Sequence, residues 1–564
     1  MQNFIKKYPD FCSICLLVVL CVFFLFFGLN FYPILDTQEA LFASVSKNLL
    51  IQDDSNLLML NMQPFLENPP LYFWLITQSI KLTNVCNEIS IRLPNTIISS
   101  IFVFFTYFMG THILSRKFGL SSAIILLTSL SYLLMSHLAI LNIAFIFFVT
   151  VALYLAFISN IKEENSKSKM FLWWGFYIFC GLACLAKGVI GFLLPFLVMI
   201  FYQMSINKLK EMLKPVFIIP GMIIFALIIV PWYYEMFTIF GISYFKNYVF
   251  ILDFKNFFSN LFYFAVLFIP AFMPWIIIFY GYIYVTIKKI VVRYKNNAKF
   301  HVISMEQKLR IFGLIYFFLT FISISIMYKS PYSILLLIPS SVLLTAHFLC
   351  SKDVDEYLKT KIIKISTYII TVLFTIWTVS FSFIYIFLPV NIFAQVQQFK
   401  NFLIIGINFL SILMLLRLKY KNIMSIIGTY VFSMFFILVF VVVHGFNMFY
   451  LSGENELVRF SQYAKTRDTN LIVYNLPIKP SILMETSEYV YFIDKNKFKD
   501  IENIFYDSKN KVCYIILKNK DVAIAEKGLS QTLYLVDKGD KYSIYSNINL
   551  PKKAISLTKF YNEK

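Results

Sequence analysis

Charged residues are scarce in this sequence. Asp, Glu, Lys and Arg make up 14% of the 564 residues, whereas an average soluble domain has about 25%. Hydrophobic residues make up 59%, and the mean hydropathy is +0.72. These values exclude disordered, collagen-like and soluble multidomain chains. Apolar runs such as residues 11–31 exceed the roughly 18 residues that mark a membrane span, so the sequence predicts a polytopic α-helical membrane protein.

Motifs for nucleotide, metal and serine-hydrolase chemistry are also missing. The sequence has no Walker loop, Gly-x-Gly-x-x-Gly or His-Glu-x-x-His pattern, and its five histidines are scattered. The eight cysteines form no zinc motif, because the Cys-x-x-Cys at 12–15 lies inside an apolar run. The sequence therefore predicts no metal site and no bound cofactor, and it does not show whether the protein needs a divalent metal. Only Cys86 and Cys513 fall on the predicted outer side, where an oxidising compartment would allow them to pair.

Thirteen apolar runs are predicted to cross the membrane. They cover residues 11–31, 93–115, 118–136, 138–160, 170–186, 189–204, 214–234, 261–287, 310–327, 332–349, 364–388, 401–417 and 422–447. Loops on the side of the N-terminus hold about three times as many Lys and Arg as the opposite loops, which places the N-terminus in the cytoplasm. The net charge of +20 then reflects topology and attraction to anionic lipids, and no nucleic-acid partner is needed to explain it.

Two long segments lie on the outer side of this topology. Residues 1–447 form the predicted membrane module, in which the first outer loop, 32–92, contains helices at 33–50 and 69–82. Backbone outside a helix must be solvated or buried in protein, so we expect this loop to fold onto the bundle. Residues 448–564 form the predicted soluble domain. Its short β-rich runs at 471–476, 489–494, 512–517, 532–537 and 542–547 indicate a small α/β fold.

Three carboxylates of the first outer loop are candidates for chemistry. Asp36 and Glu39 follow the first span directly, and their spacing is typical of a capping box at a helix start. The same spacing suits a general base that deprotonates an acceptor hydroxyl beside the membrane. Glu67 precedes two prolines and an aromatic stretch. It is either a solvated residue near a helix start or the wall of a cleft.

Two isolated lysines stand at the outer ends of apolar runs. Lys187 separates the fifth and sixth spans, and Lys329 follows the ninth span, with Tyr332 three residues later. An ionisable residue among membrane spans is a functional candidate by default, although a lysine at a helix end can also extend its ammonium to the interface. The functional alternative is a clamp for a lipid-linked phosphate.

These motifs together resemble a known family. In chain order come Glu-Asn-Pro-Pro at 67–70, Arg-Leu-Pro at 92–94, Ala-Lys-Gly at 186–188, Pro-Trp-Tyr at 231–233, Met-Pro-Trp at 273–275 and Lys-x-Pro-Tyr at 329–332. With the acidic start of the long loop and thirteen spans, the order resembles the lipid A aminoarabinose (4-amino-4-deoxy-L-arabinose) transferase and protein O-mannosyltransferase branch of the GT-C glycosyltransferases. Recognisable motifs cover residues 10–350, and the remainder matches in layout.

The resemblance implies an enzyme of the bacterial inner membrane. Such an enzyme transfers a sugar, with inversion, from a polyprenyl-phosphate donor to a lipid A-type glycolipid or a protein hydroxyl on the periplasmic face. It implies that Asp36 or Glu39 is the base and that Lys187 and Lys329 hold the donor phosphate. Glu67 and Tyr332 would lie near the sugar, and the polyprenyl-phosphate sugar is a substrate rather than a cofactor.

Neutral residues stand where the family has charged ones. They are Gln38, Asn68 and Asn142, and a histidine motif expected after the seventh span is also absent. Either Asp36 or Glu39 replaces the usual acid, or the chain is a catalytically degenerate member that still folds. The alternative function is a membrane protein that binds or flips polyprenyl-phosphate sugars. The sequence does not identify the sugar or the acceptor.

Overall fold

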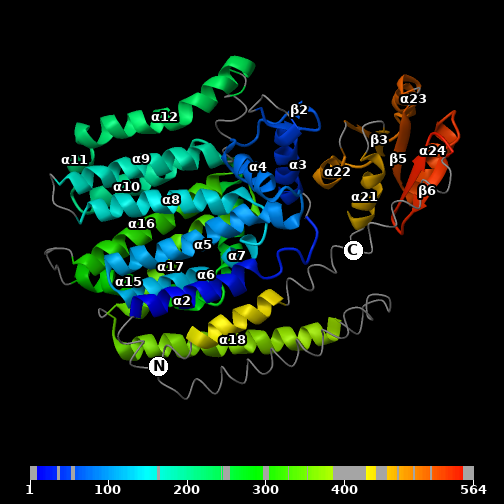
Figure 1. The fold of residues 1–564 in the computed structure, drawn as a ribbon. Coiled ribbons are helices and arrows are strands. Elements are labelled where there is room, and N and C mark those ends of the chain that lie inside the picture. Colours follow the sequence, from blue (N-terminus) through cyan, green and yellow to red (C-terminus); the bar gives the residue numbers. More distant parts are fainter. Residues whose placement is uncertain are drawn as a thin grey trace. The chain divides into compact units, whose positions relative to one another are not determined.

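The computed structural model describes most of the chain as helices with a small C-terminal sheet (Figure 1). It describes residues 9–34, 38–51, 57–161, 166–242, 244, 254–295, 304–327, 329–351, 354–384, 427–439, 454–465, 469–486, 489–508 and 511–549. The chain forms two compact units. The first comprises Met1–Leu29, Glu67–Tyr72 and Arg92–Val441, and the second comprises Asn30–Leu66, Phe73–Ile91 and Val442–Lys564.

The first unit is a bundle of apolar helices. They are α2 (Pro9–Cys21), η1 (Val22–Phe26), α5 (Glu88–Ile113), α6 (Arg116–Leu127), α7 (Leu130–Met135), α8 (Leu141–Ser159), α9 (Lys167–Lys187), α10 (Ile190–Ser205), α11 (Leu209–Met212), α12 (Pro215–Phe240), η2 (Phe254–Asn256), α14 (Phe257–Ala271), α15 (Ile276–Lys295), α16 (Met305–Ile326), η3 (Pro331–Leu337), α17 (Ile338–Cys350) and α18 (Glu356–Ile384). In the described residues, eight helical segments are long and apolar enough to cross a membrane. The protein is therefore a multi-pass membrane protein, as predicted, while the count of thirteen stays a prediction.

One predicted span, 118–136, is wrong as a single helix. The structure divides it into α6 and α7 at Thr128 and Ser129. The hydroxyls of both residues donate back to carbonyls of the preceding turn, Thr128 to Ile124 and Ser129 to Ile125. Such bonds offer the backbone an alternative to the helix. The Thr128 hydroxyl also accepts a hydrogen bond from the indole of Trp275 at 3.0 Å, so a residue far along the chain stabilises the break.

A second predicted span, 261–287, is also divided. Helix α14 ends at Ala271 and α15 begins at Ile276. Pro274 lies between them, and proline has no backbone N–H to donate to a continuing helix. The indole ring of Trp275 is fully buried at this break. The predicted span 401–417 lies outside the described residues.

Small residues allow the helices of this unit to approach one another closely. Gly110 of α5 and Gly119 of α6 face each other, and a Cβ atom on Gly119 would collide with the backbone carbonyl of Tyr107. Lipid tails are as apolar as the helix surfaces, so close packing and buried polar contacts stabilise the bundle more than apolar burial does. Helix α8 is buried along almost its whole length and packs against α9, α10 and η3.

The C-terminal part of the second unit is a five-stranded sheet between two layers of helices. The strands are β3 (Thr469–Tyr474), β4 (Val490–Ile493), β5 (Val512–Lys518), β6 (Tyr534–Lys538) and β7 (Tyr542–Ser546), in the order β4-β3-β5-β7-β6. β3 pairs in parallel with β4 and β5, whereas β7 pairs antiparallel with β5 and β6. All five predicted β-rich runs are confirmed as strands, and the predicted α/β fold is confirmed with them.

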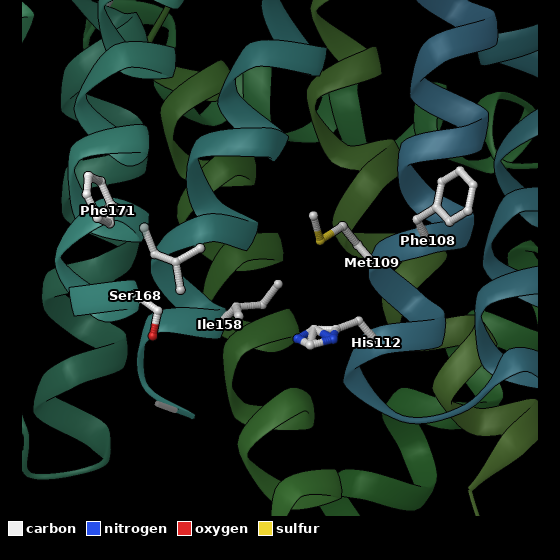
Figure 2. Close-up of a pocket in the computed structure, with 7 residues that line it drawn as sticks. Phe108, Met109, His112, Ile158, Ser168 and Phe171 are labelled. Atoms are coloured by element: carbon white, nitrogen blue, oxygen red, sulfur yellow. The ribbon is translucent and has the colours of Figure 1, made fainter. Parts of the chain in front are cut away.

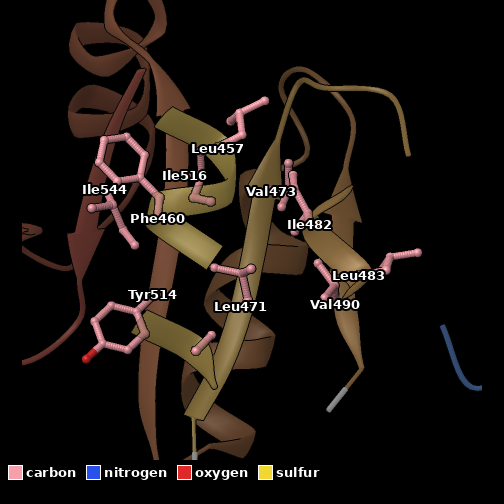
Figure 3. Close-up of a cluster of buried hydrophobic side chains, with 11 residues drawn as sticks. Leu457, Phe460, Leu471, Val473, Ile482, Leu483, Val490, Tyr514, Ile516 and Ile544 are labelled. Carbon is pink, nitrogen blue, oxygen red and sulfur yellow. The ribbon is translucent and has the colours of Figure 1, made fainter. Parts of the chain in front are cut away.

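Alternate residues of the strands face the two helical layers. Leu471 and Val473 of β3 pack with Leu457 and Phe460 of α21 (Glu454–Ser461) and with Ile482 of α22 (Pro480–Glu485), as Figure 3 shows. The intervening side chains pack on the opposite face against α23 (Phe498–Asp507) and α24 (Val522–Gly528). Both faces of the sheet are thus buried, as is typical of parallel strands with crossover helices.

The first outer loop contributes α3 (Gln38–Ile51), the hairpin β1 (Met59–Leu60) and β2 (Gln63–Pro64), and α4 (Leu71–Thr83). Both predicted loop helices are therefore confirmed. In the second unit α3 packs against α22: the Ser44 hydroxyl donates to the Pro480 carbonyl at 3.0 Å, and the Lys47 ammonium donates to the Met484 and Thr486 carbonyls. Loop and tail therefore share one compact unit, which the sequence did not predict.

The hairpin of this loop also pairs with the sheet. Asn61 lies at the hairpin tip with φ of 51°, a left-handed conformation that asparagine tolerates better than most residues. Its side-chain amide donates to the Val490 carbonyl at 3.0 Å, and its side-chain oxygen accepts from the Val490 N–H at 2.9 Å. Val490 belongs to the edge strand β4. Asn61 therefore imitates a neighbouring strand and satisfies part of an otherwise open edge.

Candidate functional site

The first candidate residue, Lys187, is the last residue of α9. Gly188 ends the helix with φ of 78°, and its N–H donates to the Cys184 carbonyl at 2.7 Å. This backbone conformation favours glycine. The Ala-Lys-Gly motif therefore has a local structural explanation: the glycine stops the helix, and the lysine is presented at its end. The Tyr233 hydroxyl of α12 also donates to the Cys184 carbonyl, at 3.4 Å.

Lys187 lies against the start of α8. Its ammonium is 3.4 Å from Oδ1 of Asn142 and 5.4 Å from the centroid of the Phe145 ring. Asn142 is the second residue of α8 and only 6% of its surface is exposed. In the described part of the chain, no carboxylate forms an ion pair with Lys187. The positive charge is therefore oriented by a neutral amide and an aromatic ring.

The opposite end of α9 differs in this respect. Lys169, in the first turn, is buried and forms an ion pair with Glu211, which also pairs with Lys208 at 3.3 Å. A buried charge without a partner is costly, so this pair is readily explained as structural. Lys187, by contrast, forms no ion pair with a carboxylate in the described residues, which leaves its ammonium available to an anionic ligand.

The second candidate, Lys329, follows the end of α16. Its ammonium lies 4.1 Å from the centroid of the Tyr263 ring of α14, within the range of a cation–π interaction. Lys329 is exposed. Helix η3 begins two residues later, and its second residue is the half-buried Tyr332. This helix packs against α7 and α8. The segment that follows Lys329 thus packs against α8, the helix that carries Asn142.

The predicted carboxylates are distributed over both units. Glu39 lies in the first turn of α3 in the second unit and is only 2% exposed. An acidic residue there interacts favourably with the helix dipole, while the predicted capping box with Asp36 stays a prediction. Glu67 belongs to the first unit and is exposed in a bend before α4. Asp36 lies outside the described residues, so its base role stays a prediction.

A surface groove in the first unit is separate from both lysines. Figure 2 shows Phe108, Met109 and His112 of α5 opposite Ile158 of α8 and Ser168 and Phe171 of α9. The volume is about 570 Å³ and the lining is almost entirely apolar. Ile158 is near the end of α8 and Ser168 near the start of α9. The groove therefore lies at the far end of these helices from Asn142 and Lys187.

The cysteines and possible metal ligands were also located. Cys86 is exposed, Cys513 is buried in β5, and both thiols are free, so the pairing that the sequence allowed is not formed. Within the described ranges no three His, Cys, Asp or Glu side chains gather as a metal site. The absence of a metal site from the whole chain stays a prediction.

Sequence reasoning missed two residues beside Lys329. Tyr263 contacts the ammonium, and Asn260, one turn earlier on α14, contacts the backbone before it. Both occur in an aromatic-rich run, FFSNLFYF. Because 19% of the residues in the chain are aromatic, one more tyrosine does not mark a functional position.

Comparison with solved structures identifies the fold. The crystal structure of ArnT from Cupriavidus metallidurans in the apo state matches 96% of this chain and 98% of its own, with a TM-score of 0.72 and 15% sequence identity. This chain has the ArnT fold. The same protein bound to undecaprenyl phosphate matches with a TM-score of 0.71 over 95% of this chain. The predicted architecture, an apolar helical bundle followed by a small domain, is confirmed.

Sequence comparisons point in the same direction. The family profile of dolichyl-phosphate-mannose-protein mannosyltransferase matches residues 55–245. An uncharacterized protein of Aquifex aeolicus is 30% identical over 201 residues, which is 35% of this chain and 39% of the relative. An undecaprenyl phosphate-α-4-amino-4-deoxy-L-arabinose arabinosyl transferase of Proteus mirabilis is 25% identical over 198 residues, 34% of this chain and 36% of the relative. The matched segments thus cover well under half of either relative, and the resemblance to ArnT-like and protein-mannosyltransferase-like glycosyltransferases is confirmed.

Proposed function

We propose that this protein is a glycosyltransferase of the bacterial inner membrane. It transfers a sugar from a polyprenyl-phosphate donor to a hydroxyl of a lipid A-type glycolipid or of a protein on the periplasmic face. The observation that carries the proposal is the Lys187 ammonium, which is held by Asn142 and Phe145 and has no carboxylate partner among the described residues. The ArnT fold and the binding of undecaprenyl phosphate by that relative support it.

The donor phosphate is assigned to the start of α8. Helix α8 is 19 residues long, and its N-cap residue Ile140 forms no side-chain cap. The first N–H groups of such a helix carry partial positive charge and bind anions. Lys187 adds a full positive charge at the same place. Lys329 is the second cation of the clamp, because η3 joins its turn to α7 and α8.

The reaction follows from these charges as a single displacement. A carboxylate takes the proton of the acceptor hydroxyl, and its oxygen attacks the anomeric carbon of the sugar. The bond from that carbon to the phosphate oxygen breaks, and the polyprenyl phosphate leaves with the electron pair. One displacement inverts the configuration at the anomeric carbon. Cations aimed at the leaving phosphate stabilise the charge that develops there.

Asp36 is the first carboxylate to test as the base. Glu39 is almost fully buried in the first turn of α3, a position that suits a structural acid. Removing a true general base commonly lowers the rate by 10²–10⁴-fold. We therefore expect Asp36→Asn to reduce transfer by that range, and Glu39→Gln to act mainly through stability of the second unit. Glu67 and Tyr332 are assigned to the sugar.

The test is a transfer assay with the purified protein in a lipid bilayer. A panel of radiolabelled polyprenyl-phosphate sugars is incubated with total envelope lipid or with unfolded envelope protein as acceptor, and products are separated by chromatography. If the wild type forms a labelled glycolipid or protein and the Asp36→Asn variant does not, the result supports the proposed transferase activity. Donor binding without any product supports the alternative, a protein that binds or flips the donor. Absence of both contradicts the proposal.

A further inference from the structure

Helix α14 binds the backbone just before Lys329. Helix α16 ends at Ile326, and the next residue, Met327, has an extended backbone with ψ of 164°. The last carbonyls of a helix lack partners within the helix and need them from elsewhere. The Asn260 side-chain amide donates to the Ser325 carbonyl at 3.3 Å and to the Met327 carbonyl at 3.4 Å. Asn260 thus caps the end of α16 from a neighbouring helix.

The same helix contacts the lysine side chain. Tyr263 follows Asn260 by three residues, which places both on one face of α14. The Lys329 ammonium lies 4.1 Å from the centroid of the Tyr263 ring. Asn260 is 1% exposed, whereas Phe262 on the adjoining face is 72% exposed. One face of α14 therefore holds both the backbone before Lys329 and its charged group.

We propose that Asn260 and Tyr263 are positioning residues that aim the Lys329 ammonium at an anionic ligand, the phosphate of the polyprenyl donor. This inference rests on the proposed function. Lys329 is exposed on a short connection, and a free lysine there has many rotamers. The ordering of such a side chain costs free energy when the ligand binds. The two contacts from α14 remove part of that cost beforehand.

The two residues have separable roles. Asn260 acts on the backbone, so its loss frees the segment between α16 and η3. Tyr263 acts on the ammonium, so its loss frees the side chain and leaves the backbone in place. A residue with a purely structural role would lower stability and would not change donor binding through Lys329. This difference allows each role to be measured.

The test compares binding of undecaprenyl phosphate to full-length variants in lipid nanodiscs. Tyr263→Leu removes the ring and is expected to weaken binding about 2-fold to 5-fold, the range of one cation–π contact. Tyr263→Phe keeps the ring and is expected to bind as the wild type does. Phe262→Leu is the matched control on the exposed face of α14. In the Lys329→Met background Tyr263→Leu is expected to have no further effect, because its partner is gone.

Hydrogen exchange tests Asn260 separately. Asn260→Leu is expected to raise amide exchange in residues 325–331 and to weaken binding, whereas Tyr263→Leu leaves exchange there unchanged. The inference would be overturned if Tyr263→Leu bound the lipid as tightly as the wild type does. It would also be overturned if Tyr263→Leu weakened binding as much in the Lys329→Met background as in the wild type. If the wild type binds the lipid and Lys329→Met binds it equally, the positioning role fails while the proposed function stands. If the wild type binds no polyprenyl phosphate, both fail.

Discussion

The ammonium of Lys187 lies 3.4 Å from the side-chain oxygen of Asn142. The end of α9 and the start of α8 therefore meet through a cation and a neutral amide. A neutral amide orients an ammonium and leaves its positive charge in place. A carboxylate would orient the ammonium and also neutralise its charge. This pair is a suitable receptor for a third group that carries negative charge.

Removing the amide is expected to weaken binding of the donor phosphate. Asn142→Leu preserves the approximate size of the side chain but removes the oxygen that accepts from Lys187. The loss of one hydrogen bond of about 1 kcal/mol corresponds to about 5-fold weaker binding of undecaprenyl phosphate in a titration. Thr150→Val, deeper in α8 where Thr150 bonds to Tyr316, is the control and should leave affinity unchanged. Equal affinities of Asn142→Leu and wild type would contradict the role of Asn142.

The pairing of loop and tail gives a prediction for stability. Asn61→Asp keeps an oxygen that accepts from the Val490 N–H but loses the N–H₂ group that donates to the Val490 carbonyl. The unpaired carbonyl is expected to cost about 1–3 kcal/mol. Amide exchange in β4 should rise accordingly. Met62→Gly at the neighbouring position, where φ is 60°, relieves backbone strain and serves as the control. If amide exchange in β4 were as slow in Asn61→Asp as in the wild type, the pairing of Asn61 with Val490 would be refuted.

Glu485 makes the stability of the second unit dependent on pH. Burial raises the pKa of Glu485 above its ordinary value of 4.5, and the charges of Lys465 and Lys47 offset this only in part. A raised pKa in the folded state contributes stability below pH 4.5, and this contribution is lost as the pH rises through the folded-state pKa. Glu485→Gln should therefore stabilise α22 against hydrogen exchange more at pH 7.5 than at pH 4.5. A gain that is the same at both pH values would contradict the assignment.

The two cysteines of the second unit are expected to differ in reactivity. Cys86 is exposed, whereas Cys513 is buried in the sheet and burial raises the pKa of its thiol. A membrane-impermeant maleimide added to intact spheroplasts should label Cys86 in a variant that keeps only that cysteine. The variant that keeps only Cys513 should react with the maleimide only after the protein is unfolded. Labelling of Cys86 only in lysed cells would reverse the predicted topology.

Local sequence patterns predicted the helices and strands that form from neighbouring residues. Helices α8 and α9 and strands β3 to β7 follow from apolar runs and turn residues. The break between α6 and α7 was missed because Trp275 bonds to Thr128 from 147 positions along the chain. Asn61 and Val490, 429 positions apart, likewise have no local signal that connects them. Contacts of this kind arise only when the whole chain has folded.

The candidate site was predictable to a similar extent. Lys187 stands out because it is the only charge between two long apolar runs. The amide that orients it is Asn142, which the resemblance marked only as a missing acid. Asn260 and Tyr263 could not be found because their relation to Lys329 depends on how α14 packs against α16. The sequence thus identified the cations, and the structure identified what holds them.

The most direct test of the central claim is equilibrium binding of undecaprenyl phosphate to the wild type and to Lys187→Met in nanodiscs. Lys81→Met, at an exposed lysine of α4 in the first outer loop, is the matched control for a lost positive charge. We expect Lys187→Met to weaken binding at least 10-fold, because charge-assisted contacts to phosphate are worth about 1.5–3 kcal/mol, and Lys81→Met to bind as the wild type does. Equal binding by all three proteins would contradict the assignment of the donor phosphate to Lys187.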